Sequence, residues 1–209
     1  MSNLKFIFIK INISLYFDNI NNIIVINHFT ILSGRKFNME IFTERLKLIP
    51  LTQDDIEMSL ESLENFYKEK GYKSNKQKLS NLMYKIYKIK LVNMKSDPDN
   101  YLFYTYWLIV KRKNNEIIGR IGFKNVPDDN LEIEIGYGIG IDFRSNGYMT
   151  EALKAMLKWG FKQTLLPIET IVAKTKDDNI PSQKVLKKAG FDYISSEEDL
   201  MCWKLNKKS

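Results

Sequence analysis

The chain has 209 residues, of which 44% are hydrophobic and 12% aromatic, and its formal net charge is +7. That length supports one sizeable core, so a single α/β or α+β domain is the default expectation. The single cysteine, Cys202, and the single histidine, His28, exclude an internal disulfide, a zinc site of cysteine and histidine ligands, and a histidine-based triad. Any catalytic or binding groups must therefore be carboxylates, hydroxyls, amides or lysines, or belong to a bound cofactor. We expect no metal.

Charge and hydropathy narrow the class of protein further. Residues 1 to 38 contain four basic residues and one acid, which is +3, so the remaining +4 is spread over the rest of the chain. No concentrated basic stripe exists, which argues against nucleic-acid binding. One cysteine favours a reducing compartment, and no apolar run reaches the roughly 18 residues of a membrane span. We expect a cytoplasmic monomer or homodimer without membrane contact.

Residues 1 to 38 differ in composition from the rest of the chain. They are rich in Ile, Asn and Phe and show no clean period. A signal peptide is excluded because Lys10, Asn12 and Asn19 interrupt the apolar stretch. The stretch "KFIFIKINISLYF" alternates for part of its length, so an extra hairpin is one alternative. Our preferred hypothesis is a leader translated from an upstream region, with the domain covering residues 39 to 209.

The first elements of the domain are a strand and two helices. "RLKLIPL", residues 45 to 51, alternates as a strand does, and Thr52 with the acids after it can begin a helix. We expect helices over residues 53 to 70 and 75 to 94, separated by Gly71. The second helix has an apolar stripe that we expect to face the core. The stripe consists of Leu79, Leu82, Met83, Ile86 and Ile89.

Strands dominate the middle of the chain. Residues 102 to 113, 116 to 123 and 131 to 140 are rich in β-branched and aromatic residues and predict an antiparallel meander. Beyond residue 161 we expect a strand over residues 168 to 174, a helix near 181 to 188 and one or two closing strands. The expected fold class is α/β (α+β), with a mixed, mostly antiparallel sheet.

One segment carries a chemical signal. "IGYGIGIDFRSNGYMTEALKAMLKWGF", residues 135 to 161, runs from a strand through a polar turn into an amphipathic helix. N–H groups at a helix start lack partners, and the helix dipole adds positive charge there, so such a turn attracts anions. Arg144 adds a forked cation, and Gly147 permits close backbone approach. The turn predicts a phosphate or pyrophosphate site; an ordinary solvent-exposed turn is the alternative.

Four segments follow one another along the chain: "TERLKLIPLTQDD", "NEIIGRIGF", "EIGYGIGIDFRSNGYMTEALKAMLKWGF" and "DNIPSQKVLKKAGF". In this order and spacing they resemble the GNAT superfamily of acyl-CoA-dependent N-acetyltransferases, in particular its ribosomal-protein N-terminal (alanine) acetyltransferase branch. The resemblance covers about residues 43 to 205. It implies a GNAT-like sheet with helices on both faces and a splayed strand pair for the cofactor. Met149 departs from the small residue that the family has at the end of this turn.

The resemblance assigns residues to acetyl-CoA. Backbone amides of the turn would wrap the pyrophosphate, and the strand around Tyr137 and Ile139 would splay to admit pantetheine. Asn179 and Ser182 would contact the cofactor near the thioester, although Asn179 also suits a helix N-cap. The turn residues are Arg144, Ser145, Asn146, Gly147, Tyr148 and Met149.

The resemblance also implies a reaction. A neutral amine would attack the thioester, the amide near Ile139 would stabilise the oxyanion, and Glu134 would take the proton through water. Glu132 lies on the same strand face, and a solvated glutamate pair is the alternative. No residue is assigned to protonate the departing thiolate.

The expected function is transfer of an acetyl group from acetyl-CoA to a primary amine, on a protein N-terminus or a small molecule. The alternative is a non-catalytic CoA-binding or interaction protein with the same fold. The helices over residues 53 to 94 would build the acceptor site.

Overall fold

The computed structural model describes residues 25–26, 39–73 and 79–208. The expected leader, residues 1 to 38, lies outside the described residues except for positions 25 and 26. The assignment of the domain to residues 39 to 209 stays a prediction. In the described part of the chain, no helix combines the length and the apolar character that crossing a bilayer requires.

The described strands form one nine-stranded sheet in the order β1-β2-β3-β4-β5-β6-β7-β9-β8. Only the β6–β7 pair is parallel among these, so the expected mixed, mostly antiparallel sheet is confirmed. The predicted meander is also confirmed, as β4, β5 and β6. The strands are β1 (Val25–Ile26), β2 (Glu40–Phe42), β3 (Leu46–Pro50), β4 (Trp107–Lys111), β5 (Glu116–Phe123), β6 (Glu132–Ile139), β7 (Thr170–Lys176), β8 (Asp192–Glu197) and β9 (Leu200–Asn206).

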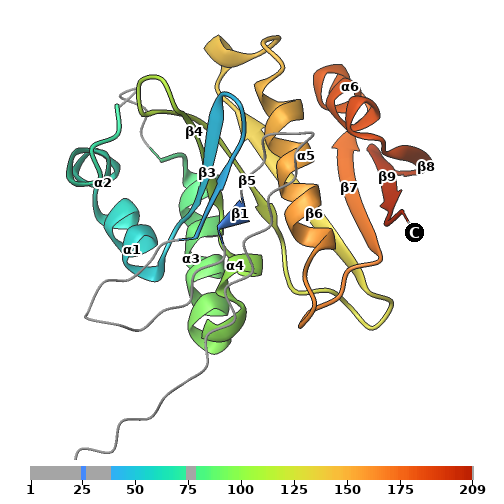
Figure 1. Cartoon of the computed structure of the whole chain (residues 1–209), viewed down its shortest axis with the longest axis horizontal. Coiled ribbons are helices and arrows are strands. Elements are labelled where there is room, and N and C mark those ends of the chain that lie inside the picture. Colours follow the sequence, from blue (N-terminus) through green and yellow to red (C-terminus); the bar gives the residue numbers. More distant parts are fainter. Residues whose placement is uncertain (1–24, 27–38, 74–78, 209) are drawn as a thin grey trace, which may run out of the picture.

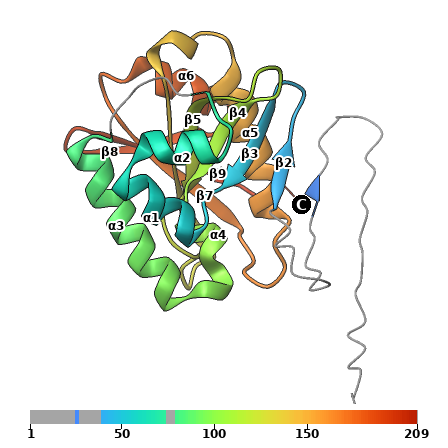
Figure 2. The same cartoon turned by 90° about the vertical axis from the view of Figure 1, so that its left-hand side faces the viewer.

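Helices cover both faces of the sheet (Figures 1 and 2). One face, the α5 face, packs against α5 and α6, and the other, the α3 face, packs against α1, α2 and α3. The helices are α1 (Gln53–Glu61), α2 (Leu63–Glu69), α3 (Asn81–Ser96), α4 (Tyr101–Tyr104), α5 (Tyr148–Phe161) and α6 (Ile180–Ala189), with short 3-10 turns η1 (Pro98–Asn100) and η2 (Ile141–Phe143).

An aromatic cluster anchors α5 to the sheet. The ring of Trp159 lies 5.0 Å from that of Trp107 on β4 and 6.0 Å from that of Phe123 on β5, measured between centroids. Phe103 of α4 completes the cluster at 5.3 Å from Trp159. Buried aromatic pairs of this kind stabilise a fold beyond their burial alone. The cluster therefore holds α5, and with it the turn that precedes α5, in a defined position.

Three boundary predictions were wrong. The helix expected over residues 75 to 94 begins only at Asn81, because Ser80 is its N-cap. Residues 102 to 106 do not continue the strand, because Tyr101–Tyr104 form α4 and the strand begins at Trp107. The Trp107 indole N–H donates to the Leu102 carbonyl at 3.0 Å, which ties this helical turn to the strand. The helix expected over residues 53 to 70 is two helices, because Ser62 ends α1 and its hydroxyl caps α2.

The core-facing stripe predicted for α3 was also wrong at two positions. Leu82 and Ile89 are 68% and 61% exposed. The buried positions of α3 are instead Tyr87, Lys90 and Met94. The helix carries apolar residues around much of its circumference, so its apolar spacing alone did not identify the buried side.

Candidate active site

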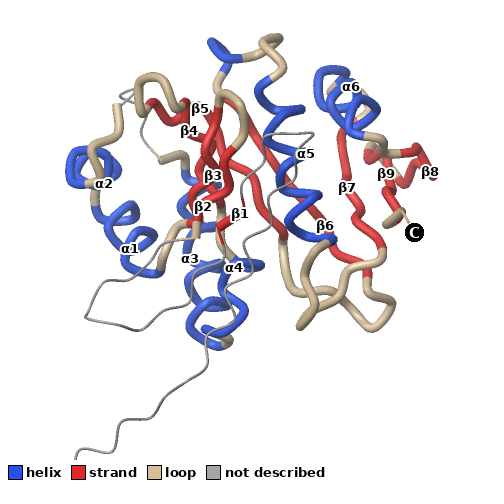
Figure 3. Tube along the Cα trace, in the orientation of Figure 1, coloured by secondary structure: helices blue, strands red, loops and turns tan. Residues whose placement is uncertain are grey.

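Strand β6 changes partners along its length. It pairs with β7 only from Glu132 to Glu134, opposite Thr170 to Val172. Its pairing with β5 continues to Ile139. Beyond Glu134 the traces of β6 and β7 separate (Figure 3). The splayed strand pair expected from the sequence is confirmed.

Open backbone groups line both sides of this separation. Lys124 N–H donates to the Glu134 carbonyl and Gly140 N–H to the Ile118 carbonyl, so these alternate residues face β5. Because the intervening residues of an antiparallel strand direct their N–H and C=O groups to the other side, Tyr137 and Ile139 direct theirs toward β7. By the same alternation, Lys174 of β7 directs its backbone groups toward β6, since its neighbours bond with β9. An extended chain with amide groups fits between two such edges.

The polar turn follows the open end of β6 through η2. Ser145 and Gly147 have positive φ angles of 63° and 77°, and Gly147 is the N-cap of α5 without a side-chain cap. Within the described residues, the backbone N–H groups of residues 145 to 150 donate to no protein acceptor. A helix of 14 residues therefore presents uncapped N–H groups beside the splayed strands. Free N–H groups at the start of a helix are the kind of feature that binds anions, and the anion site stays a prediction.

Arg45, on the turn between β2 and β3, holds the start of α5. Its Nε donates to Glu151 Oε2 at 2.7 Å, and its Nη1 donates to the Asn146 carbonyl at 3.0 Å. Its guanidinium also lies 4.5 Å from the ring centroid of Tyr148. Glu151 accepts a further bond from the Thr43 hydroxyl at 2.6 Å. Sequence reasoning missed this role, although Thr43 and Arg45 belong to one of the segments that resemble the GNAT superfamily.

The side chains of the other predicted turn residues point either into the core or toward the surface. The Met149 side chain is 5% exposed and lies in the core, so only its backbone faces the turn. The Asn146 side chain donates to the Arg144 carbonyl at 2.8 Å, which closes the turn locally. Arg144 is exposed. The departure at Met149 therefore places no bulk in the turn itself.

Tyr137, Asn179 and Ser182 meet across the splay. The Ser182 hydroxyl donates to Tyr137 Oη at 2.9 Å, and Tyr137 Oη donates to the Ser182 carbonyl at 3.2 Å. Asn179 is the N-cap of α6, and its side chain accepts from Ser182 N–H at 3.3 Å. Burial raises the pKa of Tyr137 to about 12, so this phenol is neutral at physiological pH. The structure therefore connects β6 to α6 through a side chain at the open edge.

Glu132 and Glu134 lie on the α3 face, because the alternate residues Ile133 and Ile135 belong to the core under α5. Glu134 pairs with Lys124 through Oε1 and Nζ at 2.5 Å, and Glu132 pairs with Lys204 at 2.9 Å. The two glutamates are on one face as predicted. They are separate ion pairs rather than a joint acidic site.

Lys90 of α3 is buried beside this face. Its Nζ donates to the Tyr104 carbonyl at 2.6 Å and to the Phe123 carbonyl at 3.3 Å, and lies 4.3 Å from the ring centroid of Tyr106. Burial, with a smaller contribution from the Lys124 charge, lowers the pKa of Lys90 to about 8. A lysine thus occupies a buried position of α3, between the buried residues Tyr87 and Met94, where an apolar residue would be expected.

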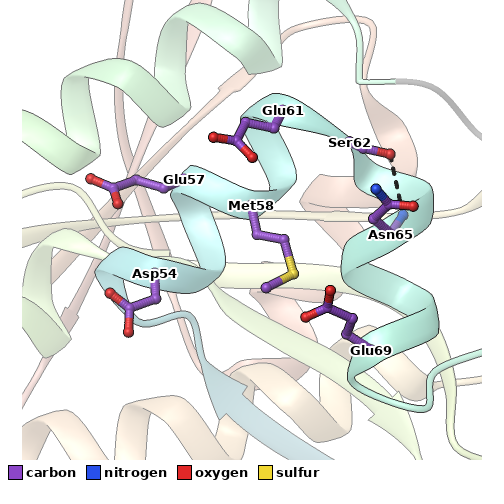
Figure 4. Close-up of a pocket in the computed structure, with 7 residues that line it drawn as sticks. All are labelled: Asp54, Glu57, Met58, Glu61, Ser62, Asn65 and Glu69. Atoms are coloured by element: carbon purple, nitrogen blue, oxygen red, sulfur yellow. Dashed lines mark hydrogen bonds between the residues drawn. The ribbon is translucent and has the colours of Figure 1, made fainter.

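An acidic groove of about 340 Å³ lies on the outer surface of α1 and α2 (Figure 4). It is lined by Asp54, Glu57, Met58, Glu61, Ser62, Asn65 and Glu69. In Figure 1 these helices lie at the opposite end of the sheet from β7. Of the helices predicted to build the acceptor site, α1 and α2 thus have their acidic surface away from the splayed strands. Glu57 in this groove is already paired to Lys95 at 2.6 Å.

Comparison with known proteins extends these observations. YjdG of Bacillus subtilis (strain 168), an uncharacterized N-acetyltransferase, is 36% identical over 97 residues, which are 46% of this chain and 56% of YjdG. The uncharacterized N-acetyltransferase p20 of Bacillus licheniformis is 34% identical over 83 residues, which are 40% of this chain and 46% of p20. The chain spans about half the length of the curated relatives it matches.

The fold is shared with solved structures. Ribosomal-protein-S5-alanine acetyltransferase from Vibrio fischeri aligns with a TM-score of 0.59 and 18% identity over 80% of this chain and 96% of that one. The protein-family model described as acetyltransferase (GNAT) domain matches residues 45 to 192 of this chain, which confirms the resemblance seen in the sequence. The chain belongs to the GNAT acetyltransferase family.

Proposed function

We propose that the protein transfers an acetyl group from acetyl-CoA to a primary amine. The observation that carries this proposal is the interruption of the β6–β7 pairing beside the uncapped start of α5. Together they offer hydrogen-bonding edges for an amide-containing arm and N–H groups for a pyrophosphate. Acetyl-CoA carries both groups and supplies a thioester carbonyl.

The residues of the turn, Arg144 to Met149, would hold the pyrophosphate through their backbone. Tyr137 and Ile139 would bind the arm along the open edge of β6, with Asn179 and Ser182 on the opposite side. The uncapped N–H groups and the left-handed Gly147 fit this assignment, because they leave donors unsatisfied where negative charge would lie.

Two groups of this chain would act on the reacting atoms. The Ile139 N–H, on the open edge of β6, would donate to the thioester oxygen and stabilise negative charge there. Glu134, on the α3 face five residues earlier, would accept the amine proton through water. Lys124 keeps the Glu134 side chain in place through their ion pair.

Release of free CoA thiol from acetyl-CoA across an amine panel tests the proposal. Thiol release that depends on an amine, with the acetylated amine identified by mass spectrometry, is the expected result. Tight binding of acetyl-CoA without thiol release on any amine would instead support a non-catalytic CoA-binding protein. The acceptor class includes protein N-termini and small-molecule amines.

A further inference from the structure

Arg120 is a cation on the α3 face that the proposed reaction does not use. It lies on β5 directly opposite Gly138 of β6. Its guanidinium is 5.7 Å from the ring centroid of Tyr87 on α3. Burial raises the pKa of Tyr87 and of Tyr106, and the nearby Arg120 charge offsets part of each rise. The Tyr87 and Tyr106 phenols near the guanidinium are therefore neutral and offer it no counter-charge.

No carboxylate among the described residues forms an ion pair with Arg120. The neighbouring cation Lys124 has Glu134 as its partner. Lys90 adds a third positive group to this region, and its Nζ is bonded to backbone carbonyls. Among the described residues, the three cations Lys90, Arg120 and Lys124 have one carboxylate partner, Glu134, since Glu132 pairs with Lys204. A half-buried charge without a counter-charge is costly, which points to an anionic partner outside the chain.

The space beside Arg120 is open. A Cβ added to Gly138 would meet no atom within 4 Å, and one added to Gly136 would meet only the Lys124 side chain, at 3.9 Å. Both glycines lie on the α3 face, between Glu134 and the open backbone of Ile139. The strand thus offers a side-chain-free surface between the proposed base and Arg120.

We propose that the acceptor is an amine that also carries a carboxylate or phosphate group, and that Arg120 binds this group. The inference rests on the proposed function, because it takes the amine to react between Glu134 and Ile139. Arg120 and Gly138 form a hydrogen-bonded pair of the antiparallel ladder, and the Cα atoms of such a pair lie about 5.5 Å apart. Because Gly138 is next to Ile139, the anionic group of the acceptor lies a few bonds from its amine. The planar guanidinium fork suits two oxygens of one anion, and neighbouring tyrosine hydroxyls add donors.

Matched acceptor pairs test this assignment. We would measure kcat/KM for a panel of amino acids against their carboxamides and for phosphoethanolamine against ethanolamine; the first pairs report carboxylate recognition and the last reports phosphate recognition. The wild-type protein should prefer the member that carries the carboxylate or phosphate in at least one kind of pair, by about tenfold or more. Arg120→Gln should remove that preference and leave kcat/KM for the member without the anionic group within about twofold, and Arg120→Lys should retain part of the preference.

Lys88→Gln is the matched control, because it removes one positive charge from the outer surface of α3. It should keep the wild-type preference. Equal use of amines with and without the anionic group by the wild-type protein, or an equal loss on both in Arg120→Gln, would overturn the proposal while leaving the transferase activity established.

A binding measurement separates this proposal from the proposed function. In calorimetry with CoA present, the N-acetylated amino acid or N-acetylphosphoethanolamine should bind about tenfold more tightly than its neutral counterpart, and Arg120→Gln should abolish the difference. If this difference appeared without acetyl transfer to any amine, the anion site would stand and the proposed reaction would fail. Absence of any difference in wild-type binding would overturn the site.

Discussion

The start of α5 and the α3 face of β5 and β6 both favour negative charge, but they do so with different groups. The turn before α5 uses backbone N–H groups and a helix dipole, which nearly any sequence can supply once the turn is formed. The α3 face uses the side chains of Arg120, Lys90 and Lys124. One substitution can therefore change what the α3 face recognises, whereas the turn changes only when its geometry is disturbed. In this interpretation, a cosubstrate common to the family binds at the backbone site and a variable acceptor at the side-chain site.

The largest expected effect tests the chemistry on the α3 face. Glu134→Gln preserves shape and removes basicity, so kcat should fall about a hundredfold while acetyl-CoA binding stays nearly intact. Part of the loss should return at high pH, where more of the amine is already neutral. Glu132→Gln, which breaks the pair with Lys204 instead, is the control and should change kcat far less. Full activity of Glu134→Gln at neutral pH would remove Glu134 from the mechanism.

The next effect concerns the backbone site. Gly147→Glu places a Cβ and a carboxylate at a left-handed position among the uncapped N–H groups, so the acetyl-CoA Kd should rise at least about tenfold, roughly 1.4 kcal/mol. Calorimetry gives the Kd directly. Gly71→Glu is the matched control because Gly71 also has a positive φ, of 68°, but lies in the loop after α2. The comparison fails if both variants weaken binding equally, since strain alone would then explain the loss.

A smaller effect sharpens the claim that turn geometry matters. Arg45→Gln removes the ion pair to Glu151 and the bond to the Asn146 carbonyl, so acetyl-CoA should bind about threefold more weakly, as expected for a half-exposed pair. Arg112→Gln is the control, because Arg112 bonds to the carbonyls of Thr43 and Glu44 on the same hairpin without touching the turn. An unchanged Kd in Arg45→Gln would show that the turn keeps its shape without this contact.

The smallest effect is a pH dependence of stability on the α3 face. The pKa of Lys90 is about 8 in the folded protein against 10.5 for an ordinary lysine, so between these values the unfolded chain binds more protons. The Lys90 contribution to the free energy of unfolding should therefore rise with pH from about 8, and the cost of the buried charge is fully present below that pH. Urea unfolding from pH 7 to 9.5 should show this rise in the wild-type protein and in Lys88→Met, but not in Lys90→Met. Parallel curves for all three would contradict the shifted pKa.

Contiguous features of the site were predictable from sequence. The turn at Gly147 and the cap at Asn179 depend on residues within one turn of each other, so the local sequence indicated the turn and offered the cap as an alternative to a cofactor contact. The contact between Arg45 and Glu151 joins positions 106 apart in the chain, and no local pattern reports such a pair. Arg120 opposite Gly138 likewise depends on strand register, which the sequence did not provide.

The same difference between features set by neighbouring residues and features set by distant contacts applies to the fold. Most strands were found from alternation, since period two is a local property. The buried side of α3 was not, because Lys90 faces the core: its aliphatic stem is buried while its Nζ reaches two carbonyls. A lysine in a core position contradicts the polarity rule on which the predicted stripe rested.

The open edges of β6 and β7 also have a thermal consequence. Only three residue pairs join β6 to β7, so the part of the sheet from β1 to β6 and the part from β7 to β9 share few backbone hydrogen bonds. A ligand that bonds to both edges would bridge the two parts and occupy groups that otherwise exchange with water. Saturating acetyl-CoA should then raise the unfolding temperature and slow amide hydrogen exchange at Tyr137 and Ile139, with a gain of about 2.7 kcal/mol at a hundredfold excess over Kd. The cosubstrate would thus add backbone hydrogen bonds between two parts of the sheet that otherwise cohere mainly through the apolar core under α5.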